Sequence, residues 1–193
     1  AVVRPVSARI LTLWLLSVGA ACAGELLEVG VERIDQRYAV DIDARFNTSA
    51  ERLRVLLTDY PNLGRINASI QRSEVLESIS AQQHWVRTEA HVCAGLFCKD
   101  IVQVQDVSVL ADGTIFATIL PQYSDLSYGI ARWQVWEEPT GTRMRFHSEI
   151  EPAFWVPPLI GPWLIQRAMQ AEALKSVANL ERLAETAVEI PGP

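Results

Sequence analysis

The chain has 193 residues, of which 49% are hydrophobic and 21% charged, and its formal net charge at pH 7 is −6. This length suits one domain with a substantial core, and an acidic chain without a lysine or arginine cluster disfavours nucleic acid as a partner. The sequence contains no phosphate-binding glycine loop and no metal-ligand spacing, so we expect no cofactor and no metal.

Residues 1–23 are typical of a secretory signal peptide. They carry two arginines, an apolar stretch over residues 10–18 that is too short to span a bilayer, and the small residues at which such signals are cut, Ala21-Cys22-Ala23. We therefore predict cleavage before Gly24 and secretion across the inner membrane into the periplasm. A lipoprotein anchored at Cys22 is the alternative, because small residues precede that cysteine.

The first elements are a strand and a short helix. Residues 29–46 alternate between apolar and polar side chains, with one slip of phase, and predict a strand. Asn47 and Thr48 then provide capping oxygens for a helix over residues 49–60, which Pro61 ends.

Six further strands follow, joined by tight turns. Consecutive strands connected in this way form an antiparallel meander. In the last strand Met144, Phe146, Ser148 and Ile150 share one face, which is mainly apolar and needs a cover. The predicted strands span residues 71–78, 84–92, 100–110, 114–120, 129–138 and 143–150.

Two cysteines, Cys93 and Cys98, lie in the stretch HVCAGLFCKD. In an oxidising compartment an isolated pair with a short loop is most simply a structural disulfide, which would stabilise this hairpin by about 2 kcal/mol. Free thiols, a redox-active pair and a metal site with His91 are the alternatives, although zinc usually takes four ligands.

A long C-terminal helix is predicted over residues 163–188, since Gly161 and Pro162 suit a helix start and neither residue type recurs within that range. Residues 189–193 are expected to be a loose tail. The helix carries an apolar stripe opposite its charged residues, so it should lie across the whole sheet. The stripe comprises Ile165, Met169, Ala173, Val177, Leu180, Ala184 and Ala187.

This order of elements resembles the START-like, or polyketide cyclase/dehydrase (SRPBCC), family, in a secreted branch. The specific similarity is the passage LLTDYPNLGRINASIQRSEVLES, and the resemblance spans residues 29–188. It implies an α+β helix-grip fold, in which a curved antiparallel sheet of six to seven strands wraps around the C-terminal helix, and a single domain over residues 24–193. The polar GRINAS departs from the coenzyme Q-binding relatives, which have aromatic and Trp-Cys residues there.

The segment AFWVPPLIGPWLI, residues 153–165, joins the last strand to the long helix. Its length and its three prolines exclude a membrane span. A rim or lid of a pocket, a part of the core, and a contact for a membrane surface or a protein partner are the three interpretations of so apolar a segment.

The leading hypothesis is non-catalytic binding of a hydrophobic small molecule, such as a lipid, a quinone or a polyketide-like ligand, between sheet and helix. Burial of apolar surface, at about 25 cal/mol per Å², would drive it. A slip of one residue in strand phase would instead direct Arg132, Gln134 and Trp136 inward. The predicted wall consists of Trp133, Val135, Met144, Phe146, Phe154, Trp155, Ile165 and Met169.

Two other functions are weighed against this hypothesis. No nucleophile elbow is present, so no catalytic residue is assigned. A cyclase or dehydratase would need Asp106, Arg132 or His147 inside the cavity, although His147 is expected to be solvated. A partner-binding module of the cell envelope would use the apolar segment 153–165 as its contact.

Overall fold

The computed structural model describes residues 25–94, 97–156, 159 and 161–186. The predicted signal peptide, Cys22 and the tail 189–193 lie outside these residues. Within the described part of the chain, no helix is long and apolar enough to cross a membrane.

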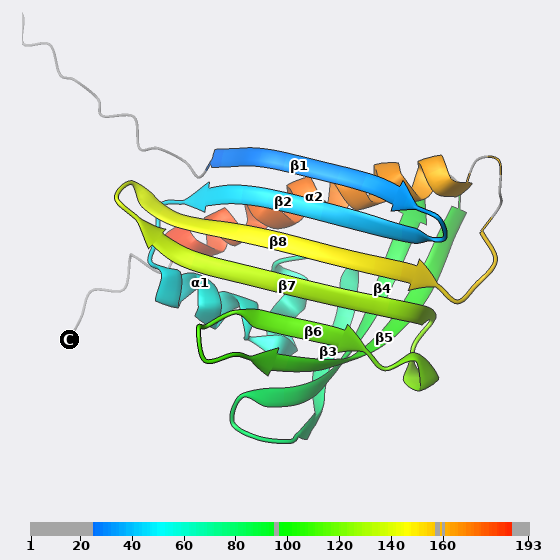
Figure 1. Cartoon of the computed structure of the whole chain (residues 1–193), viewed down its shortest axis with the longest axis horizontal. Helices are drawn as coiled ribbons and strands as arrows, with labels where there is room; N and C mark the ends of the chain where they lie inside the picture. Colours follow the sequence, from blue (N-terminus) through cyan, green and yellow to red (C-terminus); the bar gives the residue numbers. More distant parts are fainter. Residues whose placement is uncertain (1–24, 95–96, 157–158, 160, 187–193) are drawn as a thin grey trace, which may run out of the picture.

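Eight antiparallel strands form one curved sheet, in the order β1-β2-β8-β7-β6-β5-β4-β3 (Figure 1). This confirms the α+β helix-grip prediction, with eight strands where six to seven were expected. The meander runs from β3 to β8, and β2 pairs with β8 to add the first two strands. The strands are β1 Glu25–Ile34, β2 Arg37–Phe46, β3 Ile70–Ser78, β4 Gln83–Ala94, β5 Phe97–Val109, β6 Ile115–Ile119, β7 Leu126–Glu138 and β8 Gly141–Pro152.

The single strand predicted over residues 29–46 is instead the hairpin of β1 and β2. Its turn is at Asp35 and Gln36, where Asp35 has a φ of 57° and Ile34 pairs with Arg37. Next to the turn, this register pairs odd-numbered positions of one strand with even-numbered positions of the other. The alternation of apolar and polar side chains therefore shifts by one residue at the turn. The slip of phase in the sequence was therefore the turn itself.

The helix after β2 is α1, Ala50–Leu57, which is shorter than predicted. Ser49 caps it, rather than Asn47 or Thr48, by accepting a hydrogen bond of 3.2 Å from the backbone N–H of Arg52. A 3₁₀ helix, η1 Tyr60–Arg65, follows with Pro61 in its first turn. The two short helices thus lie in the long connection between β2 and β3.

The C-terminal helix α2, Gly161–Glu185, runs along one face of the sheet and contacts β1, β2, β4 and α1 (Figure 1). Its buried side chains Leu180, Leu183 and Ala184 pack in one cluster with Phe46 of β2 and Leu53 of α1. The predicted cover of the apolar sheet face is confirmed. The predicted stripe position Ala187 lies outside the described residues.

The other face of the sheet, which we call the outer face, carries ion pairs. Arg143 donates to both carboxylate oxygens of Asp43, at 2.7 and 2.8 Å, and Arg145 adds a third hydrogen bond at 3.1 Å. The hydrogen bond from Arg143 is the main reason that the pKa of Asp43 lies below its usual value. Along β2 and β8 the two faces of the sheet therefore differ in chemistry, with apolar side chains toward α2 and charges outside.

Candidate ligand-binding site

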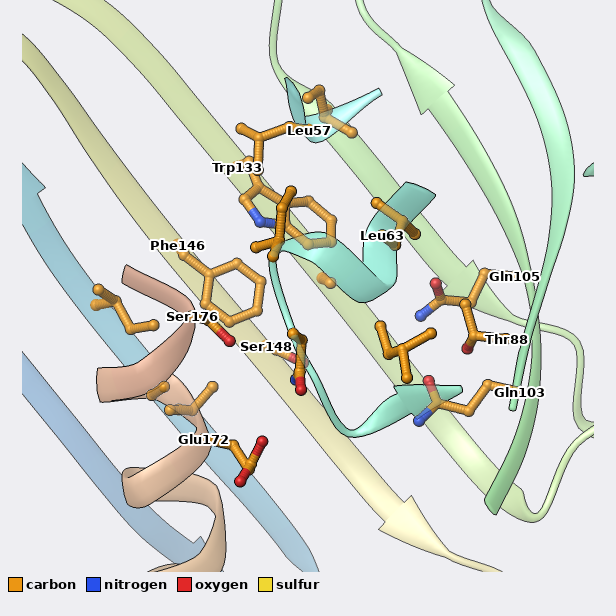
Figure 2. A pocket seen from close by; sticks show the side chains of 18 of the residues that line it. Leu57, Leu63, Thr88, Gln103, Gln105, Trp133, Phe146, Ser148, Glu172 and Ser176 are labelled. Carbon is orange, nitrogen blue, oxygen red and sulfur yellow. The ribbon is translucent and has the colours of Figure 1, made fainter. Parts of the chain in front are cut away.

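A cavity of about 360 Å³ lies between the inner face of the sheet, α2 and the two short helices (Figure 2). Strands β2 and β4 to β8 form its wall, α1 and η1 close one end, and one face of α2 covers it. Its size falls at the lower end of the range of small-molecule pockets. The sheet and α2 thus do not close completely on each other.

One side of the cavity is aromatic and aliphatic. The rings of Trp133 on β7 and Phe146 on β8 lie 4.8 Å apart between centroids and face the cavity, with Leu57 and Leu63 at the end formed by the short helices (Figure 2). Met169 of α2 packs against the same cluster. An apolar part of a ligand would be buried here.

The opposite side is polar. Thr88 of β4 and Gln103 and Gln105 of β5 point into the cavity (Figure 2), and their side chains form no hydrogen bond with other residues that the structure describes. The hydroxyl of Tyr60, which also lines the cavity, is buried without a hydrogen-bond partner in the same part of the chain. Burial raises the pKa of Tyr60. Hydroxyl and amide side chains can both donate and accept hydrogen bonds, so this side is suited to a polar group of a ligand.

Glu172 forms a second polar part of the cavity lining, at the boundary between α2 and the connection from η1 to β3. It accepts hydrogen bonds from Ser69 Oγ at 2.6 Å and Lys175 Nζ at 2.9 Å. Burial alone would raise the pKa of Glu172, but these two hydrogen bonds outweigh it and the pKa is lowered. Asn179 also donates to the carbonyl of Ile66 at 3.1 Å. Two hydrogen bonds therefore fix the residue 66–69 connection against α2.

Four of the predicted wall residues, Trp133, Met144, Phe146 and Met169, line the cavity. The strand phase was therefore predicted correctly, since Arg132 and Gln134 are exposed on the outer face.

Val135 and Ile165 do not line the cavity. Val135 points inward but is packed in the core with α1 and the end of α2, while Ile165 lies on α2 before the segment that covers the cavity. Alternation predicts which face a side chain takes, but not where along a strand another element fills the space.

Phe154 and Trp155 also lie outside the cavity lining. Lys99 Nζ lies 4.6 Å from the ring centroid of Phe154, and Trp155 is 78% exposed. Leu159 and Trp163 are 94% and 59% exposed. The described part of residues 153–165 thus exposes three large apolar side chains, Trp155, Leu159 and Trp163, which we call together the exposed joint.

Four residues that line the cavity, Thr88, Gln103, Gln105 and Tyr60, were not predicted from the sequence. A signal was present in Val102-Gln103-Val104-Gln105, where glutamines alternate with valines in a strand. The valines face outward, where Val104 is buried beside Trp85 and Tyr123. The usual reading of alternation, apolar inward and polar outward, is thus reversed on this part of β5.

The three residues weighed for a cyclase or dehydratase do not reach the cavity. Asp106 accepts two hydrogen bonds from Gln83 Nε2, at 2.9 and 3.0 Å, and Arg132 and His147 lie on the outer face. Burial opposes protonation of His147, but its contacts with Asp41 at 2.8 Å and Glu149 at 3.5 Å outweigh this and raise its pKa. None of the three is placed to act on a molecule in the cavity.

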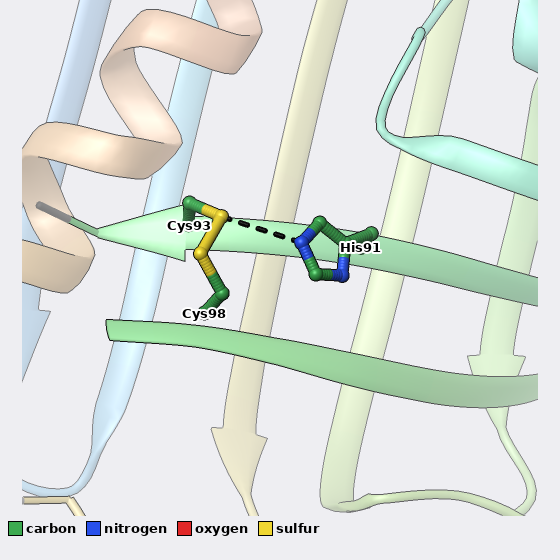
Figure 3. A group of neighbouring side chains, drawn as sticks. All are labelled: His91, Cys93 and Cys98. Carbon is green, nitrogen blue, oxygen red and sulfur yellow. Dashed lines mark hydrogen bonds between the residues drawn. A yellow bond between two sulfur atoms is a disulfide. The ribbon is translucent and has the colours of Figure 1, made fainter. Parts of the chain in front are cut away.

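Cys93 and Cys98 form a disulfide, as predicted. With His91 they are a group of potential metal ligands among the described residues (Figure 3). Metal ligation by cysteine requires a thiolate, and these sulfurs are bonded to each other.

No model of a protein family matches the chain, and no curated protein matches its sequence. Solved structures do match its fold. An aromatase/cyclase from Streptomyces sp. R1128 superimposes with a TM-score of 0.68 at 14% identity, over 81% of this chain and 98% of its own. A STAR-related lipid transfer protein from Xanthomonas axonopodis gives 0.62 at 13% identity, over 84% and 99%. The human StAR-related lipid transfer protein 5 gives 0.59 at 13% identity, over 88% and 89%. The chain therefore has the START-like helix-grip fold.

Proposed function

We propose that this protein binds a hydrophobic small molecule with a polar group, and does so without catalysing a reaction. The observation that carries this proposal is the division of the cavity into an aromatic side, at Trp133 and Phe146, and a polar side, at Thr88, Gln103 and Gln105, whose side chains form no hydrogen bond with the residues that the structure describes. Apolar burial supplies affinity and the polar groups fix orientation. The similar structures include lipid transfer proteins, which supports a ligand of this class.

We further propose that the chain is exported across the inner membrane and works in the periplasm as one domain over residues 24–193. The disulfide between Cys93 and Cys98 supports this, because disulfides persist in oxidising compartments. The composition of residues 1–23 supports it independently.

A cyclase-type activity is the second candidate. It is favoured by the likeness to the aromatase/cyclase and by two titratable side chains at the cavity, Tyr60 and Glu172. Under this alternative those two residues, and not Asp106, Arg132 or His147, would contact the reacting molecule. Conversion of a bound polyketide-like compound during incubation would favour the second candidate over the first.

Filling the cavity tests the binding proposal. Ser176 of α2 points into the cavity (Figure 2) and its side chain makes no hydrogen bond with the described residues, so Ser176→Phe should occupy the space without removing an internal contact. We expect the affinity for the apolar fluorescent probe N-phenyl-1-naphthylamine to fall on the order of tenfold or more, because the ring displaces the probe. Fluorescence titration measures this change.

The matched control is Ala178→Phe, which adds the same ring on the exposed side of α2 and should leave the affinity unchanged. Thermal unfolding of both variants checks that the fold is kept. Equal affinity in Ser176→Phe, together with an empty organic extract of the natively purified protein, would contradict ligand binding in this cavity.

A further inference from the structure

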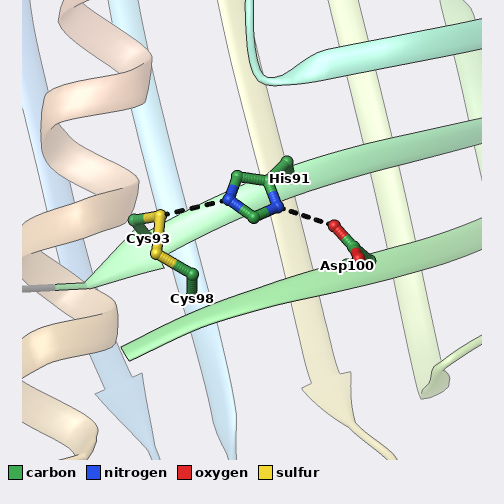
Figure 4. Close-up of a disulfide and its surroundings, with 4 residues drawn as sticks. All are labelled: His91, Cys93, Cys98 and Asp100. Atoms are coloured by element: carbon green, nitrogen blue, oxygen red, sulfur yellow. Dashed lines mark hydrogen bonds and ion pairs between the residues drawn. A yellow bond between two sulfur atoms is a disulfide. The ribbon is translucent and has the colours of Figure 1, made fainter. Parts of the chain in front are cut away.

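Four polar and sulfur-bearing side chains share the outer face at the end of the β4–β5 hairpin. In the register of these strands His91 pairs with Asp100, and Cys93 pairs with Cys98. Residues two apart on a strand point to the same side, so the four side chains form a two-by-two group (Figure 4). The cavity lies on the opposite side of the sheet, so this group is separate from the proposed ligand site.

The imidazole of His91 bridges the carboxylate and the disulfide. Its Nδ1 lies 2.6 Å from Asp100 Oδ1, and its Nε2 lies 3.4 Å from Cys93 Sγ (Figure 4). A carboxylate only accepts hydrogen bonds, so Nδ1 carries a proton. The other nitrogen is thereby aimed at one sulfur of the disulfide and not at both.

The group is open to molecules in solution. His91 is 43% exposed and Asp100 is 84% exposed, and both cysteines are exposed as well. A structural disulfide needs no imidazole at its sulfur, and the β4–β5 ladder already continues past it to the pair Ala94 and Phe97. Exposed disulfides are the ones that exchange with external thiols.

We propose that Cys93, Cys98, His91 and Asp100 form a thiol–disulfide exchange site for an external dithiol. A thiolate of the dithiol attacks Cys98 Sγ and forms a mixed disulfide, while the bond between the cysteines breaks. The electron pair of the broken bond goes to Cys93 Sγ, and this sulfur takes a proton from His91 Nε2. The second thiol of the reductant then attacks its own sulfur in the mixed disulfide. Cys98 leaves as a thiol, and the dithiol leaves as a cyclic disulfide that has lost two electrons.

The geometry assigns different roles to the two cysteines. Exchange is faster when the leaving sulfur is a stabilised thiolate or is protonated as it leaves, and His91 contacts Cys93. Cys93 is therefore the leaving sulfur and Cys98 the attacked one. Asp100 is a positioning residue, since it touches the imidazole and neither sulfur in the described contacts.

The first test is the rate of reduction by dithiothreitol in the full chain, with Cys22→Ser to leave two cysteines, followed by trapping with a maleimide and mass spectrometry. We expect His91→Ala to slow reduction on the order of tenfold at pH 6. The difference should narrow as the pH is raised, because a general acid contributes only while it carries the proton that it donates. Glu89, the next acidic residue along this face, forms ion pairs with Arg87 at 2.8 Å and with Arg72 at 4.0 Å. Among the described contacts, Asp100 is therefore the carboxylate that pairs with the imidazole of His91.

The control is His147→Ala, which removes another surface histidine paired with an aspartate but with no sulfur near it in the described contacts. It should reduce at the rate of the parent. Equal rates in the parent, His91→Ala and His147→Ala would overturn the proposal and leave the disulfide as a structural bond.

The second test asks which sulfur is attacked. The monothiol glutathione gives a mixed disulfide that peptide mapping can locate. We expect the adduct on Cys98 in the parent and a more even distribution in His91→Ala. An adduct on Cys93, or an even distribution in the parent, would overturn the assignment whatever the rates.

Discussion

Gln103 and Gln105 place two side-chain amides in a cavity whose other side is formed by Trp133 and Phe146. Neither amide forms a hydrogen bond with the described residues, so the donors and the acceptor of each remain open to a ligand. At the scale of single residues, they are the feature that distinguishes a site for an amphipathic ligand from a site for a hydrocarbon.

Replacing Gln105 by leucine should therefore change selectivity more than fold. We expect the affinity for cis-parinaric acid, which has a carboxyl group, to fall about 5- to 30-fold through loss of one hydrogen bond. The affinity for the hydrocarbon diphenylhexatriene should be unchanged or higher. Fluorescence titration of both probes measures the two affinities.

The control for this substitution is Gln134→Leu, which lies exposed on the outer face of β7 and should alter neither affinity. An equal loss for both probes would mean that Gln105 supports the shape of the cavity and makes no specific contact.

At the scale of elements, the hairpin of β1 and β2 extends the sheet beyond the meander and gives α2 part of its contact surface. Its turn depends on Asp35, a non-glycine residue with a φ of 57°. That conformation is disfavoured for side chains with a Cβ and is favourable for glycine.

Asp35→Gly should consequently raise the free energy of unfolding by about 0.5–1 kcal/mol. Urea denaturation followed by tryptophan fluorescence measures it. Gln36→Gly serves as the matched change, because Gln36 is not at a positive φ and glycine there adds only flexibility to the unfolded chain. A stability loss in Asp35→Gly as large as in Gln36→Gly would contradict the assigned turn.

At the scale of the whole molecule, apolar surface is also exposed outside the cavity, at the exposed joint between β8 and α2. Trp155, Leu159 and Trp163 form it, with Arg167 lying 5.6 Å from the ring centroid of Trp163. Tryptophan side chains favour the interface between membrane and water. We propose that the exposed joint makes transient contact with a membrane surface, from which a hydrophobic ligand is taken up or to which it is released.

This contact predicts binding to phosphatidylcholine vesicles, seen as a blue shift of tryptophan fluorescence and as co-sedimentation. The double variant Trp155→Ser and Trp163→Ser should lose most of the binding, because it removes the two aromatic rings. Tyr123→Ser, which removes an exposed ring on η2, Pro121–Tyr123, should bind like the parent. If it weakens binding as much as the double variant does, the exposed joint is not the membrane contact.

The local pattern of the sequence determined much of this protein. Period-two alternation predicted the strands of the meander and the inward face of Trp133 and Phe146, and the absence of proline and glycine from residues 163–188 predicted the extent of α2 to within a few residues. The spacing of Cys93 and Cys98, together with the oxidising compartment expected from the sequence, predicted their disulfide. Each of these depends on residues close together in the chain, which is why a single sequence was sufficient.

Only the tertiary structure decided where the cavity lies and which groups it exposes. Val135 is inward-facing like Trp133, yet α1 fills the space beside it while the space beside Trp133 stays open. Gln103 and Gln105 face inward because Val104, between them, is buried on the outer face beside Trp85 and Tyr123. Both outcomes come from packing between segments distant in sequence, and the alternation within one strand carries no record of what covers it.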